Sequence, residues 1–164
     1  MKYSKIYLRQ LILFITLIMA QSASWAFQNE PDAFRGTEWG TNLDKVDDMV
    51  VTEPPNKFGE CTYQKKNDKL RIGTGIVESI RYSSLKNRFF FVEIIFSGSN
   101  NRKKLLQSYL GLYGQPQESP KTPLGESWIW KGNKVNITFV WLSISNNGFI
   151  TYEYLPISKE TGYQ

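Results

Sequence analysis

The sequence predicts an α+β domain in which an antiparallel sheet of hairpins and a meander carries two helices on one face. Two observations predict this class. Apolar residues recur at helical spacing in two segments, and elsewhere they alternate or form short runs between turn residues. The expected order is a helix, three or four strands, a second helix and three strands, which suits a sheet with its helices segregated to one face.

The first predicted helix follows Thr41, whose hydroxyl suits an N-cap, and ends before Pro54-Pro55. Acidic residues at positions 44, 47 and 48 favour its early turns, where the helix dipole is positive. The apolar residues at helical spacing are Leu43, Val46, Met49 and Val50.

A hairpin is expected next, with strands over residues 60–66 and 69–74. Asn67-Asp68 would form its turn, because this pair tolerates positive φ. The register sets Tyr63 opposite Ile72.

Two further strands are expected over residues 76–82 and 88–96. The second is the most apolar strand of the chain, since Glu93 alone interrupts the apolar residues of its two faces between positions 89 and 96. This pattern is typical of a central strand that is covered on both faces, or covered on one of them by a partner.

The second predicted helix covers about residues 101–113 and is the clearest element. Gly114 occupies the position of a left-handed C-cap, and Pro116 prevents the helix from continuing. Its apolar stripe consists of Leu105, Leu106, Tyr109, Leu110 and Tyr113.

A three-stranded meander is expected at residues 128–130, 135–142 and 149–154. The tight turns Gly132-Asn133 and Asn147-Gly148 would set Trp130 opposite Val135 and Trp141 opposite Tyr154. Both registers agree on one heavy apolar face, formed by Trp128, Trp130, Val135, Ile137, Phe139, Trp141, Tyr152 and Tyr154.

The first 26 residues have the three parts of a cleavable export signal. Lys2, Lys5 and Arg9 precede the apolar run LILFITLIMA, and small residues precede a cleavage site between Ala26 and Phe27. The run is shorter than the roughly 20 residues that span a bilayer, so a cleaved signal is preferred over a membrane anchor. We therefore expect a periplasmic or secreted protein with no stable membrane span, one domain over residues 27–156 and a loose tail over 157–164.

The composition excludes several kinds of chemistry. The chain has no histidine, which excludes His-dependent nucleophilic sites and His-ligated zinc. Cys61 is the only cysteine, so no intramolecular disulfide can form; it shares the face of Tyr63, and a buried thiol is preferred over a reactive one. The chain has 20 Lys and Arg against 15 Asp and Glu, but much of the excess lies in the export signal, so no nucleic-acid partner is expected. No metal or cofactor is expected either.

One candidate binding site lies at the start of the second helix, where three cations follow a polar segment. Hydroxyls, free backbone N–H groups and these cations together could hold a phosphate, an acidic lipid or a glycan group. A solvated basic turn without a ligand is the alternative. The residues are Ser99, Asn100, Asn101, Arg102, Lys103 and Lys104.

Tryptophans and carboxylates give weaker indications. Trp39, Trp128 and Trp130 could stack on a sugar or a peptide, but the meander register already accounts for the last two as core residues. Carboxylates could hydrolyse glycosidic bonds without histidine, yet no spacing brings a pair together, and no catalytic residue is assigned. The scattered carboxylates are Glu60, Asp68, Glu78, Glu93 and Glu126.

Residues 34–40 form an F-x-G-x-x-W-G start, and Tyr113-Gly114-Gln115-Pro116 ends the second predicted helix. With these motifs and the strand at residues 88–96, the chain resembles small exported bacterial proteins of unknown function. The resemblance implies a bacterial periplasmic setting and a stand-alone domain. It implies no activity and no site residue.

The leading hypothesis is a non-enzymatic exported module that binds an envelope protein or an anionic ligand. Its alternatives are a carboxylate-dependent hydrolase of envelope polymers and a structural or assembly factor of the envelope. A pocket with two close carboxylates would favour the hydrolase, and an exposed apolar patch around Phe89 and Phe91 would favour a protein partner.

Overall fold

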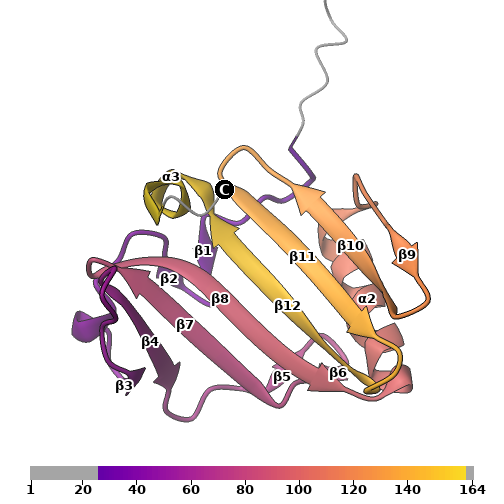
Figure 1. Ribbon diagram of the computed structural model, residues 1–164, viewed down its shortest axis with the longest axis horizontal. Coiled ribbons are helices and arrows are strands. Elements are labelled where there is room, and N and C mark those ends of the chain that lie inside the picture. Colours follow the sequence, from indigo (N-terminus) through magenta and orange to yellow (C-terminus); the bar gives the residue numbers. More distant parts are fainter. Residues whose placement is uncertain (1–25, 162–164) are drawn as a thin grey trace, which may run out of the picture.

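The computed structural model describes residues 26–161, which form a single large antiparallel sheet with one long helix packed on it. Figure 1 shows the helix α2 behind one half of the sheet. The eight strands lie in the order β3-β4-β7-β8-β12-β11-β10-β9. Their bounds are Met49–Glu53 (β3), Glu60–Lys65 (β4), Ser79–Leu85 (β7), Arg88–Ser97 (β8), Asn147–Tyr154 (β12), Val135–Leu142 (β11), Gly125–Lys131 (β10) and Lys121–Thr122 (β9). The predicted α+β class is confirmed.

Shorter elements complete the fold. Two small hairpins lie outside the large sheet, β1 (Ala33–Phe34) with β2 (Thr37–Glu38), and β5 (Arg71–Ile72) with β6 (Gly75–Ile76). The helices are α2 (Ser99–Tyr113), the single-turn α3 (Leu155–Ser158) and the 3₁₀ turns η1 (Leu43–Lys45) and η2 (Lys159–Thr161). No helix among the described residues is long and apolar enough to cross a membrane.

The core lies between the sheet and a second layer made of α2, the hairpin β5-β6 and the N-terminal segment. Leu105 and Tyr109 of α2 are fully buried against it, as the predicted stripe requires. Phe34 brings the N-terminal segment into the same core, with its ring 5.0 Å from that of Tyr152. Cys61 is buried there too, which confirms the preferred prediction for the thiol.

The first predicted helix is wrong. Residues 43–45 form only a 3₁₀ turn, capped by the Asn42 side chain, and Val46 is already extended. Asp48 then takes a positive φ of 67°, and Met49 begins β3, which pairs with β4. Pairing with a neighbouring strand therefore overrides the local helical spacing.

The predicted hairpin over residues 60–74 is also wrong in its pairing. β4 lies between β3 and β7, with Tyr63 opposite Tyr82, and residues 71–76 form the separate hairpin β5-β6. Asn67 does take the expected positive φ, of 58°. After this turn Arg35 binds the carbonyl oxygens of Lys69 and Arg71, which holds the chain away from β4.

The meander is confirmed, but both of its registers are wrong. Trp130 pairs with Ile137, and Trp141 pairs with Gly148. The first loop is longer than a two-residue turn because the Glu30 carboxylate accepts hydrogen bonds from the backbone N–H groups of residues 133–135. Both registers are shifted by an even number of residues, and an even shift leaves each side chain on the same face of the sheet. The predicted apolar face of the meander therefore still lies on the side of α2.

The tail was expected to be loose from residue 157, but residues 157 and 158 belong to a helix. Residues 155–158 form α3, and Ile157 is buried in a small cluster with Leu85 and Phe90. Figure 1 shows α3 at one end of the sheet, beside the ends of β8 and β12. At the other terminus, Phe27 is buried and its ring packs edge-on against Tyr113. Residues 1–25 of the predicted export signal lie outside the described residues.

Candidate functional site

The face of the large sheet that is turned away from α2 is the main candidate site. We call it the open face, and Figure 1 looks onto it. No helix among residues 26–161 covers its centre, where the side chains are half-buried by their own neighbours. Its central residues are Glu93, Ile95, Phe149, Thr151, Thr138, Val140, Ser127 and Ile129.

An apolar strip crosses three strands at the middle of the open face. Ile95 of β8 lies directly opposite Phe149 of β12, which lies opposite Val140 of β11. Side chains that face each other across strands are in contact distance and pack together. The strip is therefore continuous, although its members lie far apart in the sequence.

The strip leads to a hollow at the edge of the sheet. The hollow has a volume of about 200 Å³ and is lined by Val140, Leu142 and Leu124, among others. Leu124 is 63% exposed, Leu142 39% and the neighbouring Ile144 80%. A hydrogen bond of 3.0 Å from the Ser143 N–H to the Leu124 carbonyl joins the turn after β11 to the turn before β10. We call the five residues Ile95, Phe149, Val140, Leu142 and Leu124 the apolar patch.

Charged groups beside the apolar patch are paired within the protein. Arg81 and Glu93 form an ion pair at 3.4 Å on the open face. Lys131 pairs with Glu118, and Glu153 accepts a hydrogen bond from Ser158. The open face therefore offers an apolar centre with little unpaired charge.

The apolar patch is not where the sequence suggested it. Phe89 is fully buried and stacks on Trp39, with ring centroids 4.7 Å apart. Phe91 packs partly against the cluster of Leu85, Phe90 and Ile157. A large apolar residue in a turn segment, as at Leu124, was the available sequence signal for the patch.

The residues of the predicted anion site do not share one environment. Arg102 leans toward the sheet, where Nη1 lies 3.2 Å from Oε2 of Glu126. Its guanidinium carbon lies 5.4 Å from the Trp141 ring and 5.9 Å from the Trp128 ring. Arg102 therefore covers the core rather than facing a ligand.

The other residues of that site stay near the start of α2. The Asn101 side chain donates to the Ile76 carbonyl at 2.6 Å and accepts from the Ile76 N–H at 2.9 Å, so it fastens β6. Asn100, Asn101 and Lys104 line a hollow of about 390 Å³ together with Glu78. Ser99 and Lys103 are exposed. These contacts do not favour the anion site, which stays a prediction.

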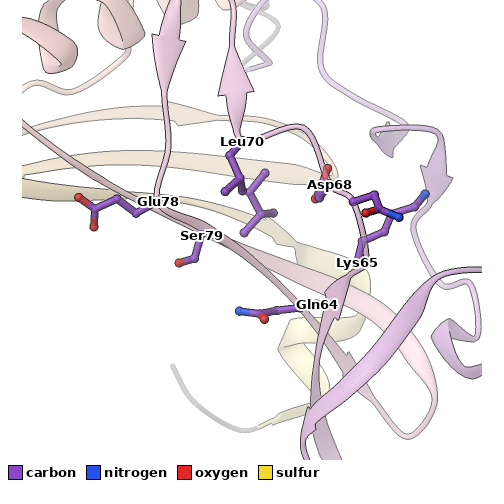
Figure 2. Close-up of a pocket in the computed structure, with 8 residues that line it drawn as sticks. Gln64, Lys65, Asp68, Leu70, Glu78 and Ser79 are labelled. Atoms are coloured by element: carbon purple, nitrogen blue, oxygen red, sulfur yellow. The ribbon is translucent and has the colours of Figure 1, made fainter.

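Asp68 and Glu78 are the candidate carboxylates that line one hollow, of about 240 Å³. Figure 2 shows them on opposite sides of Leu70. Both Asp68 oxygens are engaged, Oδ1 by Arg35 and Oδ2 by the Tyr82 hydroxyl at 2.6 Å. Burial and this hydrogen bond raise the pKa of Tyr82.

The remaining contacts of these carboxylates are structural. Glu78 accepts from the Ser97 hydroxyl, while Glu60, Glu93 and Glu126 lie on other parts of the sheet. Among residues 26–161, no three acidic or cysteine side chains converge as metal ligands would. The geometry thus gives no support to a carboxylate pair acting as acid and base.

The three candidate tryptophans belong to the core or its edge. Trp130 is fully buried, and its indole N–H donates to the Gly114 carbonyl at 3.0 Å. Trp128 packs edge-on against Phe139, and Trp39 donates to the Pro31 carbonyl at 2.9 Å. This confirms the core assignment of Trp128 and Trp130.

Comparison with family models, curated proteins and solved structures finds no match to this chain.

Proposed function

We propose that this protein is an exported, non-enzymatic binding module that docks a partner protein on its open face. The apolar patch carries the proposal. Monomeric soluble proteins rarely expose continuous apolar patches larger than a few hundred Å² unless a partner covers them. Here the strip of Ile95, Phe149 and Val140 continues into a hollow rimmed by exposed leucines.

The chemistry of the patch indicates the kind of partner. Protein interfaces have an apolar, well-packed centre with few charges and a polar rim. The charges around the patch are paired internally, as in Arg81–Glu93, so they add little attraction for a polyanion. The hollow of about 200 Å³ has room for one large apolar side chain, such as an anchoring Phe, Met or Leu of the partner.

The non-enzymatic part of the proposal is supported by the carboxylates. A general acid or base must have an oxygen available to a substrate. Both oxygens of Asp68 accept hydrogen bonds, from Arg35 and Tyr82, and one oxygen of Glu78 accepts from Ser97. No described observation favours the hydrolase over the binding module.

Export is proposed from the sequence of residues 1–26. Expression of the full chain in a bacterium, followed by fractionation and intact-mass measurement, tests it. We expect the protein in the periplasm or medium with Phe27 as its first residue. Recovery of the full-length chain in the cytoplasm would overturn this part of the proposal.

A matched pair of variants tests the docking surface. Leu142 and Val50 both lie on the open face and are equally exposed, at 39%, but Val50 lies on β3 at the opposite side of the sheet. A partner is first captured from envelope extract with the wild-type mature protein and is then titrated with each variant. We expect Leu142→Arg to weaken binding by about 30-fold, the effect of losing an interface hot spot of about 2 kcal/mol. Val50→Arg should leave the affinity unchanged, and an equal loss in both variants would contradict the proposal.

A further inference from the structure

A cationic hollow lies on the other half of the sheet from the apolar patch. It has a volume of about 480 Å³, within the range of small-ligand sites. Four of its six lining residues are cations and one is a carboxylate. The lining residues are Arg35, Lys65, Asn67, Asp68, Lys69 and Arg71.

The positive charge of this hollow is neutralised only in part, because one carboxylate lines it beside four cations. Asp68 is the one carboxylate among the lining residues, and it pairs with Arg35 and also accepts from Tyr82. Lys65, Lys69 and Arg71 form no ion pair within residues 26–161. Three cations that line one concave space repel each other, and a bound anion would relieve that repulsion.

The backbone that presents these cations is fixed. The Arg35 guanidinium donates to the Lys69 carbonyl at 2.6 Å and to the Arg71 carbonyl at 2.8 Å. Its main chain takes a positive φ of 50°, and the same guanidinium binds Asp68. A site that is already ordered loses less entropy when its ligand binds.

We propose that this hollow binds a phosphomonoester carried on a small hydroxylated group, such as a sugar or polyol phosphate. A phosphomonoester carries close to two negative charges at neutral pH, and its three oxygens can accept from lysine and arginine together. The volume of about 480 Å³ leaves room for an organic part beside one phosphate.

The hollow of Figure 2 would take that organic part. It shares Lys65, Asn67 and Asp68 with the cationic hollow and adds Gln64, Ser79 and Glu78 as hydrogen-bonding groups. Leu70 supplies an apolar surface for the carbon side of a ring. This inference is independent of the protein partner proposed for the open face.

Calorimetry on the mature protein tests the inference with four probes: glucose 6-phosphate, glucose, inorganic phosphate, and phosphatidylcholine vesicles that contain phosphatidic acid. We expect glucose 6-phosphate to bind more tightly than inorganic phosphate and glucose not to bind. Binding to the vesicles together with weak glucose 6-phosphate binding would identify a lipid as the source of the phosphomonoester. Failure of every phosphate-bearing probe to bind would overturn the site.

Two double variants remove the same charge from different places. Lys69→Gln with Arg71→Gln should weaken the binding of the phosphate-bearing probe at least tenfold. Lys103→Gln with Lys104→Gln, at the start of α2, should leave it unchanged. Equal losses would show diffuse attraction to a basic protein and would overturn the site. Circular dichroism verifies that both variants fold, which is expected because Lys69, Arg71, Lys103 and Lys104 are exposed.

Discussion

Replacement of Gly148 by alanine is expected to destabilise the protein by about 2 kcal/mol or more, because no space exists for a methyl group there. A Cβ atom at this position would lie 2.3 Å from the Val140 carbonyl oxygen and 2.5 Å from Cζ of Phe96. The carbonyl belongs to strand β11 and cannot retreat without disturbing the sheet. The Phe96 ring is fully buried between Phe139 and Trp141, at centroid distances of 5.0 and 6.0 Å, so it cannot retreat either.

Gly111→Ala is the matched control. A Cβ at Gly111 meets nothing within 4 Å, and the residue is exposed in α2. Alanine in a helix is favoured over glycine by about 0.5–1 kcal/mol, so the control should be more stable than the wild type. Urea unfolding followed by circular dichroism gives both free energies. If Gly148→Ala costs less than about 0.5 kcal/mol, the register that places Gly148 against Phe96 is refuted.

Four further predictions concern groups that are buried or held by several contacts. Burial raises the pKa values of Tyr109 and Tyr152, so the folded protein holds their protons more tightly than the unfolded chain. The free energy of unfolding should therefore be insensitive to these groups below about pH 10 and fall above it, by up to about 1.4 kcal/mol per pH unit for each tyrosine; an unchanged value in urea titrations at higher pH would contradict this. Glu30→Gln should lower the free energy of unfolding by about 1–3 kcal/mol, because it weakens a charged acceptor of three backbone N–H groups, and a thermal melt identical to wild type would count against that role. Arg102→Gln should cost about 1–2 kcal/mol through lost stacking on two tryptophans, measured by urea unfolding, with the exposed Lys103→Gln as the unaffected control. The Cys61 thiol should react with a thiol reagent only after unfolding in urea, and rapid reaction of the native protein would show that it is not buried.

The parts of the fold that the sequence predicts correctly are those set by local pattern. α2 follows from the spacing of Leu105 and Tyr109 and from Gly114, which takes a positive φ of 75°. β8 could be predicted because its run of apolar residues does not depend on which strands it pairs with. The heavy face of the meander follows from alternation, which survives an even shift of register.

Long-range contacts explain the errors. Glu30 lies about a hundred positions before the loop whose N–H groups it binds, so no local rule could give the register of Trp130. Residues 49 and 50 have apolar spacing that predicts a helix, but they form the edge strand β3 because they pair with β4. Asn147-Gly148 is typical of a turn, but in the structure it belongs to β12. Gly148 pairs there with Phe96, whose ring leaves no space for a side chain.

The candidate sites were harder to predict because each joins distant segments. The apolar strip becomes continuous only once β8, β12 and β11 are known to be neighbours. The cationic hollow combines Arg35 with residues 65–71, and only the fold brings them together. The run Arg102-Lys103-Lys104 stood out in the sequence, but Arg102 lies against Trp128 and Trp141.

Site-specific photo-crosslinking in cells of the producing organism tests the open face as a docking surface most directly. A photoreactive residue is placed at Leu142 in one variant and at Val50 in another, since both side chains are 39% exposed on the same face. We predict one specific crosslinked protein at Leu142 and none at Val50. Crosslinks of equal yield at both positions, or at Val50 alone, would contradict a partner docked on the apolar patch.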